Sequence, residues 1–230
     1  GNKDIYFNET VFDDEKCEVV FSGTDFGEEG EVSFDYMQGI NGSIEFYKCS
    51  FGQKTLNFAY MRCPKGQFSF WEVETPSTPI DFVDSFVRMI LMYKANVNGL
   101  LDFRISEAEH IVIQESVIRD CVLLGNQGYK NFTCYSLKKS TLLGRIRIQN
   151  KFSKRLFHKQ LQYVYDPAQG EIVLCSTSAT DKANQLIILS ENYQSEGESD
   201  NADAAYVLSK RYRSTGRVHD IWTDYAAVGR

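Results

Sequence analysis

The 230-residue chain is poor in the residues that build catalytic and metal sites. Its three histidines, His110, His158 and His219, lie far apart and do not share the spacing of metal ligands. It contains no glycine-rich phosphate-binding loop and no serine nucleophile motif. We therefore expect the histidines to be surface or capping residues. We predict no catalytic residue, no cofactor-binding residue and no metal ligand, and we expect the protein not to be an enzyme.

Cysteines at redox or zinc-ligand spacing are also missing. None of the six cysteines forms a Cys-x-x-Cys pair. Several occupy positions where the repeat described below needs a small or apolar residue, which favours buried free thiols in a reducing cytosol. Disulfides are the alternative interpretation. The six are Cys17, Cys49, Cys63, Cys121, Cys134 and Cys175.

Long apolar runs are absent as well. No stretch approaches the roughly 18 continuous apolar residues that suggest a membrane span. No secretory signal is visible, so we expect a cytoplasmic location. Tryptophan is scarce, with 2 residues, whereas phenylalanine is abundant, with 16. This bias towards one aromatic residue points to a regular use of phenylalanine in the core.

Phenylalanines recur at a fixed interval in the centre of the chain. Four of them follow one another at equal spacing, and each ends a triplet of apolar, polar and apolar residues. Such triplets are typical of short strands with alternate side chains inward. Most units carry a second apolar residue five positions later, and a small residue stands two before it. The four phenylalanines are Phe46, Phe58, Phe70 and Phe82.

Units of roughly a dozen residues are too short for a strand and a helix together. Two units would make one coil of a solenoid, with identical residues stacked as ladders inside it. Glycines between the units suggest corners with unusual backbone angles; they are Gly23, Gly27, Gly30, Gly39, Gly42, Gly52 and Gly66. The alternative is a β-sandwich of short strands. We predict a mainly β fold, with the solenoid as its first domain over residues 1–150.

The small-x-apolar unit resembles the core of the pentapeptide-repeat family, whose pattern is Ala-(Asp/Asn)-(Leu/Phe)-x-x. The resemblance covers about residues 5–124 and implies a right-handed β-helix. The pentapeptides here come in pairs separated by spacers, so the resemblance implies irregular coils and not a regular square tube. The matching units are Thr10-Val-Phe12, Thr24-Asp-Phe26, Cys49-Ser-Phe51, Ala95-Asn-Val97 and Ser116-Val-Ile118.

Charge is distributed unevenly along the chain. Residues 1–120 contain 21 acidic and 10 basic residues, whereas residues 121–230 contain 10 acidic and 15 basic residues. The acidic stretch from Asp13 to Glu31 is either a solvated, edge-blocking end of the solenoid or an acidic interaction surface. Asp13, Asp14, Glu15 and Asp102 could in principle hold a divalent cation, although solvated acids are the simpler interpretation.

Residues 151–230 form the second predicted domain: a basic linker, a β-hairpin and a helical hairpin. Leu142 to Ile148 reads as one last exposed strand. Lys151 to Leu161 suits a basic amphipathic helix, which either caps the solenoid or binds a membrane surface or an acidic partner. Tyr163 to Leu174 reads as two strands about a turn that contains Pro167 and Gly170.

Two helices are predicted next. The first is capped by Thr180 or Asp181 and stopped by Gly197. A polar loop follows from Glu196 to Asp203, and a second helix ends near Gly216. Together they would form an antiparallel helical hairpin.

Residues 160–217, with Gln185 to Gly197 and then Ala205-Tyr206-Val, are similar to a segment of some bacterial membrane proteins. Those proteins combine irregular pentapeptide repeats, this hairpin and a two-helix ion-channel pore. The resemblance implies that such a pore would follow Arg230 and that the basic residues Lys210, Arg211, Arg213 and Arg217 would lie beside the membrane.

These observations lead to one favoured function and two alternatives. The favoured function is a non-enzymatic cytosolic interaction or regulatory domain, the soluble region of a channel-like bacterial membrane protein. We expect a protein partner, membrane association through a further C-terminal region, and no direct contact with nucleic acid. One alternative is a free-standing pentapeptide-repeat protein that mimics DNA toward a topoisomerase. The other is a carbohydrate-active β-helix protein.

Overall fold

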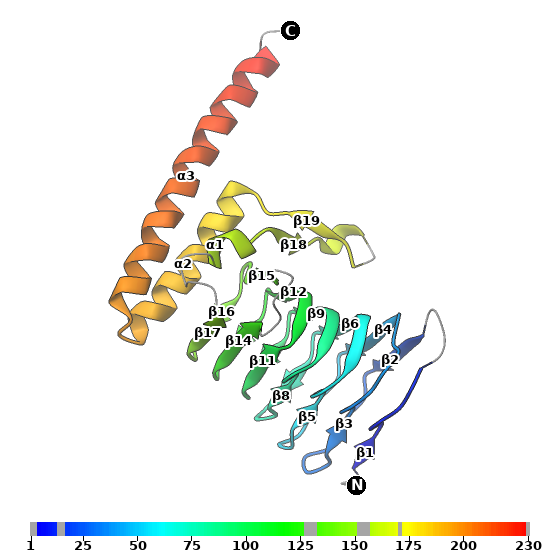
Figure 1. The fold of residues 1–230 in the computed structure, drawn as a ribbon. Coiled ribbons are helices and arrows are strands. Elements are labelled where there is room, and N and C mark those ends of the chain that lie inside the picture. The colour runs from blue at the N-terminus through cyan, green and yellow to red at the C-terminus, as the bar shows by residue number, and fades with distance from the viewer. Residues whose placement is uncertain (1–3, 13–16, 127–132, 151–156, 170–171, 229–230) are drawn as a thin grey trace.

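Parallel strands wind around one core through most of the chain. A computed structural model describes residues 4–12, 17–126, 133–150, 157–169 and 172–228 (Figure 1). Sheets A, B and C have the strand orders β1-β3-β5-β8-β11-β14-β17, β2-β4-β6-β9-β12-β15 and β7-β10-β13-β16. Every pairing in these three sheets is parallel. The predicted β-solenoid is thus confirmed and the β-sandwich alternative is wrong, because sandwiches are built from antiparallel sheets.

The strands of each sheet are short. Sheet A contains β1 (Ile5–Tyr6), β3 (Val32–Ser33), β5 (Leu56–Asn57), β8 (Ile80–Asp81), β11 (Leu101–Ile105), β14 (Val122–Asn126) and β17 (Ile146–Asn150). Sheet B contains β2 (Glu18–Ser22), β4 (Ser43–Tyr47), β6 (Arg62–Trp71), β9 (Phe86–Tyr93), β12 (Glu107–Gln114) and β15 (Cys134–Ser136). Sheet C contains β7 (Glu74–Thr75), β10 (Asn96–Val97), β13 (Val117–Ile118) and β16 (Thr141–Leu142).

One coil of the solenoid corresponds to two repeat units, as predicted. In sheet A the paired residues Val32, Leu56 and Ile80 follow one another at equal intervals along the chain, each interval being twice the phenylalanine spacing. The steps from Ile80 to Leu101 and from Leu101 to Val122 are shorter. The coils therefore differ in length, in agreement with the expected irregular solenoid. Its right-handedness stays a prediction.

The phenylalanines form two ladders inside the solenoid. On the sheet A side, the ring of Phe58 stacks on Phe34 at 5.0 Å and on Phe82 at 4.6 Å between centroids. On the sheet B side, Phe46 stacks on Phe70 at 5.1 Å. The two ladders meet edge to face, with Phe46 and Phe58 6.0 Å apart. All five rings are at most 1 % exposed, so each coil buries its aromatic rings against the next.

Small buried residues occupy several corners of the solenoid. Cys49, Ala95 and Ser116 are buried at equivalent corners, as predicted for a crowded turn, and the larger Val73 occupies the corner between Cys49 and Ala95. The Ser116 hydroxyl donates to the carbonyl of Gln114 (2.9 Å) and accepts from the amide of Ala95 (3.0 Å). The hydroxyl thus satisfies backbone groups of two coils at one corner.

Left-handed backbone angles also occur at the corners. Among the described residues, nine that are not glycine have φ between 51° and 58°. Lys48 and Glu115 are two of them, and they directly precede Cys49 and Ser116. The expectation that glycines supply such angles is only partly right. Gly23 fits it, with φ of 59°, but Gly42 does not. A Cβ at Gly42 would lie 1.8 Å from the carbonyl oxygen of Cys17, so glycine is needed there because two coils approach closely.

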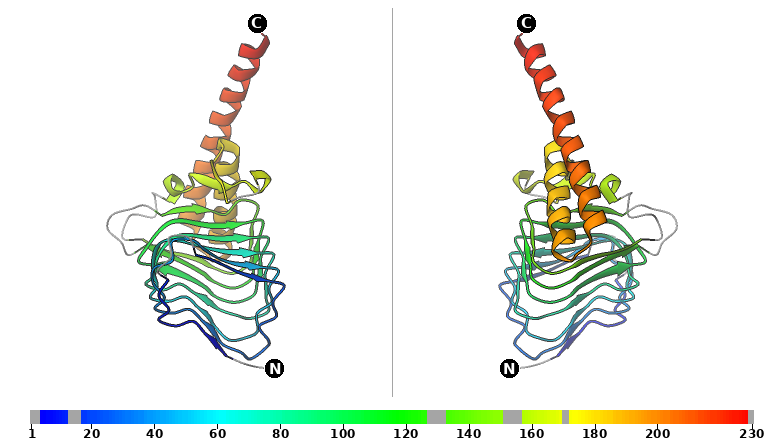
Figure 2. Two further views of the ribbon diagram at one scale, coloured as in Figure 1. Left: turned by 90° about the vertical axis from the view of Figure 1, so that its right-hand side faces the viewer. Right: turned by 90° about the vertical axis from the view of Figure 1, so that its left-hand side faces the viewer.

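The C-terminal part contains a hairpin and two long helices, as predicted (Figure 1). Strands β18 (Tyr163–Tyr165) and β19 (Leu174–Ser176) pair antiparallel, with the 3-10 helix η2 (Pro167–Gln169) between them. The helices are α2 (Ala179–Ser195) and α3 (Ser199–Val228), and both views of Figure 2 show α3 extending away from the solenoid. In the described part of the chain, no helix is both long and apolar enough to cross a membrane.

Several helix boundaries differ from the prediction. The cap of α2 is Ser178, whose hydroxyl accepts from the amide of Asp181 at 3.0 Å, so neither Thr180 nor Asp181 is the cap. Gly197, with φ of 74°, ends α2 as predicted. The predicted polar loop from Glu196 to Asp203 is wrong, since α3 begins at Ser199.

The end predicted near Gly216 is also wrong, because α3 continues through it. One glycine costs a helix only about 1 kcal/mol relative to alanine, too little to stop a long helix.

Two predictions around the solenoid end need correction. Leu142 to Ile148 is not one exposed strand: it divides between β16 of sheet C and β17 of sheet A, and Ile146 is buried beneath α2. The predicted basic helix from Lys151 to Leu161 lies partly outside the described residues. Within them only α1 (Phe157–Gln160) is helical, and Leu161 is buried in the core.

All six cysteines are free thiols, as expected. Cys49 and Cys63 are buried, whereas the other four are partly exposed, so complete burial was predicted too broadly. Burial raises the pKa of Cys49 and Cys63, which keeps these thiols protonated at neutral pH.

Candidate functional site

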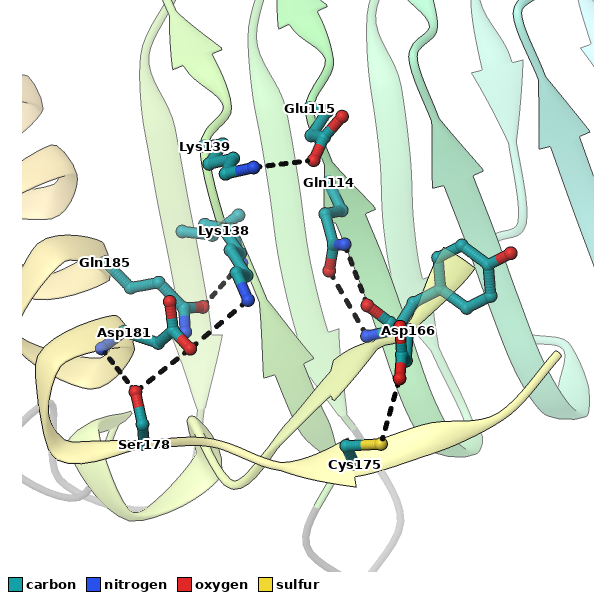
Figure 3. Close-up of polar contacts among 11 residues, drawn as sticks. Gln114, Glu115, Lys138, Lys139, Asp166, Cys175, Ser178, Asp181 and Gln185 are labelled. Carbon is teal, nitrogen blue, oxygen red and sulfur yellow. Dashed lines mark hydrogen bonds and ion pairs between the residues drawn. The ribbon is translucent and has the colours of Figure 1, made fainter. Parts of the chain in front are cut away.

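The solenoid and the C-terminal hairpins meet in a network of polar contacts. Figure 3 shows Gln114 of β12 facing the hairpin and Lys138, which follows β15, facing α2. The participating residues are far apart in sequence, and no motif marks them. We treat this junction as the candidate functional site because it determines how the C-terminal helices are held.

Two buried amide side chains on α2 cap the last coil. Gln185 Oε1 accepts from the amide of Leu137 at 2.7 Å. Asn192 Oδ1 accepts from the amide of Ile146 at 3.0 Å, and Asn192 Nδ2 donates to the carbonyl of Gly144 at 2.7 Å. Gln185 and Asn192 are two helical turns apart, so both lie on one face of the helix. They satisfy backbone groups that the last coil would otherwise bury without partners.

Apolar contacts accompany these hydrogen bonds. Leu186 and Leu189 of α2 are buried in the same core as Leu137 and Ile146 of the solenoid. Helix α2 therefore closes the end of the solenoid as part of its core. Repeat proteins need such caps, because a terminal coil has no neighbour to cover its apolar side.

Ion pairs surround the buried cap. Lys138 Nζ lies 3.2 Å from a carboxylate oxygen of Asp181, whose amide also bonds the Ser178 hydroxyl (Figure 3). Arg145 pairs with Glu196 at the other end of α2. Both pairs are about one quarter to one third exposed, so we expect each to contribute under about 1 kcal/mol. They position α2, whereas the buried amides and leucines supply most of the attachment.

The β-hairpin covers the outer face of sheet B. The Gln114 side chain forms two hydrogen bonds with the backbone of Tyr165: Nε2 donates to the carbonyl at 2.9 Å, and Oε1 accepts from the amide at 3.2 Å (Figure 3). Leu91 and Val112 are buried beneath the hairpin, and the Tyr165 ring lies 5.3 Å from that of Trp71. The hairpin thus hides an apolar patch that a bare solenoid would expose.

His110 of β12 contradicts the expectation of a surface or capping histidine. Its ring packs edge to face on Tyr163 of the hairpin at 5.3 Å, and its Nδ1 is buried without a hydrogen-bond partner among the described residues. Burial lowers the pKa of His110, an effect that Glu109 opposes and Arg88 reinforces. The side chains of His158 and His219 are not among those that the structure describes.

We expect the hairpin to loosen at acid pH because of His110. A histidine whose pKa is lowered in the folded protein stabilises the fold at pH values above the ordinary histidine pKa of about 6.5. This contribution is lost as the pH falls through the lower folded value. Fluorescence of Trp71, in a protein with Trp222 replaced by phenylalanine, should change between pH 7.5 and 5.5. The change should disappear in His110→Phe, and an unaltered change there would contradict the assignment.

The described acids include one close pair that the sequence did not suggest. Asp81 and Asp102 are neighbours in β8 and β11, and burial raises the pKa of Asp81. Asp102, considered above as a cation ligand, is instead held by the Arg104 guanidinium, whose Nε lies 2.8 Å from Oδ1. Both carboxylates also accept a backbone amide two residues later, which is a turn-stabilising role.

Asp13, Asp14 and Glu15 lie outside the described residues. Within the described ones, no three histidine, cysteine or acidic side chains gather as metal ligands would.

Tyr193 of α2 provides a test of the junction at alkaline pH. Its ring packs against the core, and burial, helped by Glu198, raises the pKa of Tyr193 to about 12. An unfolded tyrosine ionises near pH 10, so the folded protein keeps a proton that the unfolded chain loses. Stability should fall above pH 10 by about 1.4 kcal/mol per pH unit from this residue. Urea unfolding at pH 9–12 should show a shallower fall for Tyr193→Phe, and identical slopes would contradict this account.

Comparison with known proteins assigns neither family nor activity to the chain. No protein-family model matches it, and it has no significant match among curated proteins or solved structures.

Proposed function

We propose that the chain is a non-enzymatic cytosolic interaction domain and forms the soluble region of a channel-like membrane protein. The observation that carries the proposal is the attachment of α2 to the end of the solenoid by buried amides and shared core leucines. Helix α3 packs on α2 and extends away from the solenoid (Figures 1 and 2). A partner bound to the solenoid would therefore act on α3 through a rigid connection.

The basic residues of α3 support a position beside a membrane. Lys210, Arg211 and Arg213 are exposed on α3. Basic clusters flank membrane spans on the cytoplasmic side, where they also attract anionic lipids.

The coil geometry supports a pentapeptide-repeat type of solenoid within this proposal. At three corners a small buried residue is followed two positions later by a buried apolar one, as in Cys49 and Phe51 or Ala95 and Val97. This is the small-x-apolar core to which the sequence bears a resemblance. The spacers between such pairs account for coils of unequal length.

The gene that encodes the chain tests the membrane part of the proposal. Two apolar segments of about 20 residues are expected downstream of the α3 codons. A stop codon directly after Arg230 would overturn the membrane part and leave a free-standing interaction domain.

Ion flux through the whole protein in liposomes would then test whether partner binding at the solenoid is coupled to the membrane part. Asn192→Leu, which weakens the junction, should change the response to a solenoid-bound partner, whereas Glu191→Leu on the exposed side of α2 should not. Equal responses from both variants would contradict rigid coupling.

DNA mimicry receives less support from the surface charges. The residues at one corner of the solenoid alternate in the sign of their charge, with Lys48 3.8 Å from Glu72 and Lys139 3.1 Å from Glu115. A DNA mimic needs an even row of carboxylates, and acids are concentrated only in the first coils. Inhibition of gyrase supercoiling at micromolar protein would favour mimicry over the interaction domain proposed here.

A further inference from the structure

The two ends of the solenoid differ in how their terminal coils are covered. At the C-terminal end, α2 supplies hydrogen bonds and leucines to the last coil. At the other end, β1 and β2 are the outermost strands of sheets A and B (Figure 1). Among the described residues, no helix or strand covers them. An open strand edge is a template for pairing with another chain.

Strand β2 presents half of its backbone groups to the open side. The amide of Gly23 donates to the carbonyl of Tyr47 (2.9 Å), and the amide of Ser43 donates to the carbonyl of Cys17 (3.0 Å). The odd-numbered residues of β2 therefore bond to β4. Since bonding alternates along a parallel strand, the N–H and C=O groups of Glu18, Val20 and Ser22 point to the open side.

In the part of the chain that the structure describes, the apolar ladders also end there without a covering layer. Phe7 and Phe21 stack on Phe34 and Phe46 of the next coil at 4.9 and 5.1 Å. Phe34 and Phe46 are at most 1 % exposed, whereas Phe7, Phe21 and Val19 are only partly buried. One further strand over β2 would bury the part of this apolar edge that Val19 and Phe21 form.

The acidic charge at this end of the solenoid favours a partner strand that is basic. Residues 4–12 and 17–31 contain seven acidic residues and no lysine or arginine. Four of the acids, together with Gln53 and Lys54, line an open pocket of about 690 Å³ beside the first coils: Asp4, Glu28, Glu29 and Glu31. Two such ends would repel each other, which disfavours pairing with the same end of a second copy. A basic segment would be attracted.

We propose that β2 at this end docks an extended, basic segment of a partner protein as an added strand. Its alternate apolar side chains would cover Val19 and Phe21, and its lysines or arginines would lie among the acids of the first coils. The edge supplies affinity through backbone hydrogen bonds, and the acids supply selectivity. This inference deepens the proposed function and rests on it, because it identifies the solenoid surface at which an interaction partner binds.

A synthetic peptide provides the probe. It has about nine residues, the length of a long strand, alternates valine with lysine, and is blocked at both ends. Its fluorescence anisotropy with the 230-residue protein should show binding that weakens between about 0.05 and about 0.5 M salt. The same peptide with glutamate in place of lysine should not bind. Equal binding of the two peptides would overturn the charge selectivity.

The decisive variant is Val20→Pro. It removes an N–H from the open edge and leaves the bonds to β4 in place, and proline is tolerated at such edge positions. Val20→Thr is the matched control, because it keeps the N–H. Peptide affinity should fall about tenfold or more in Val20→Pro and stay near wild type in Val20→Thr. Circular dichroism melts of both variants confirm folding, and a second edge variant, Ser22→Pro, replaces Val20→Pro if that protein unfolds.

Salt-sensitive binding that Val20→Pro leaves unchanged would overturn strand docking and show non-specific attraction only. No binding by the wild type would overturn it as well. Neither result bears on the membrane segments expected in the gene, so failure of this inference is distinguishable from failure of the proposed function.

Discussion

Replacing Phe58 with alanine is expected to lower the free energy of unfolding by about 3–5 kcal/mol. The Phe58 ring is fully buried and stacks between Phe34 and Phe82 at 5.0 and 4.6 Å. Its removal leaves a cavity in the middle of the solenoid that neighbouring rings cannot fill, since each is held by its own ladder. Urea unfolding followed by circular dichroism measures the loss.

Because Phe58 lies in the middle of the solenoid, Phe58→Ala should also change the shape of the unfolding transition. Each coil contacts only its neighbours, so a central defect should separate the N-terminal coils from the capped C-terminal ones. Unfolding should become broader or show two transitions.

Tyr47→Ala is the matched control, because Tyr47 lies on the outer face of β4 and is 39 % exposed. It should cost less than about 1 kcal/mol. A Phe58→Ala protein no less stable than Tyr47→Ala would contradict a continuous aromatic core.

The second large effect is expected at the cap. Asn192→Leu should lower stability by about 2–5 kcal/mol, because it leaves the buried amide of Ile146 and the partly buried carbonyl of Gly144 without their partner. Hydrogen exchange should show lost protection in β17 and α2 before the central coils. Glu191→Leu introduces the same side chain on the exposed side of α2 and should have little effect.

Gln185→Leu should be milder, although Gln185 is fully buried. It loses the bond to the Leu137 amide (2.7 Å), but it also removes Nε2, which is buried without a partner among the described residues. We expect a net cost of about 1 kcal/mol. A larger loss for Gln185→Leu than for Asn192→Leu would contradict this view of the cap.

The interior of the solenoid could be predicted from sequence because its signal is periodic. Phe46, Phe58, Phe70 and Phe82 recur at equal intervals, and stacked coils convert that regularity into ladders. The end of the repeat, near Leu142 to Ile148, has a weaker sequence signal. Leu142 to Ile148 looked like one strand, because so short a segment does not reveal a corner at which the chain passes from sheet C to sheet A.

The junction could not be predicted, because its contacts join residues that are distant in the chain. Gln114 meets Tyr165, and Leu137 meets Gln185, at separations in sequence that no local pattern records. His110 illustrates the same limit. Its strand pattern gave no sign that the hairpin would cover it.

Local and repeated patterns in the chain suffice to specify the parallel solenoid, the β-hairpin and the two helices. Period-2 and period-3.6 patterns select strands and helices locally, and a repeat makes every coil bury the same positions. The two ends of the solenoid differ only in three dimensions: α2 closes one end, whereas no described residue covers β1 and β2 at the other. This difference depends on which side chains, distant in sequence, lie close enough to hydrogen-bond the unpaired backbone groups of the terminal coils. Such distances are set only when the chain folds.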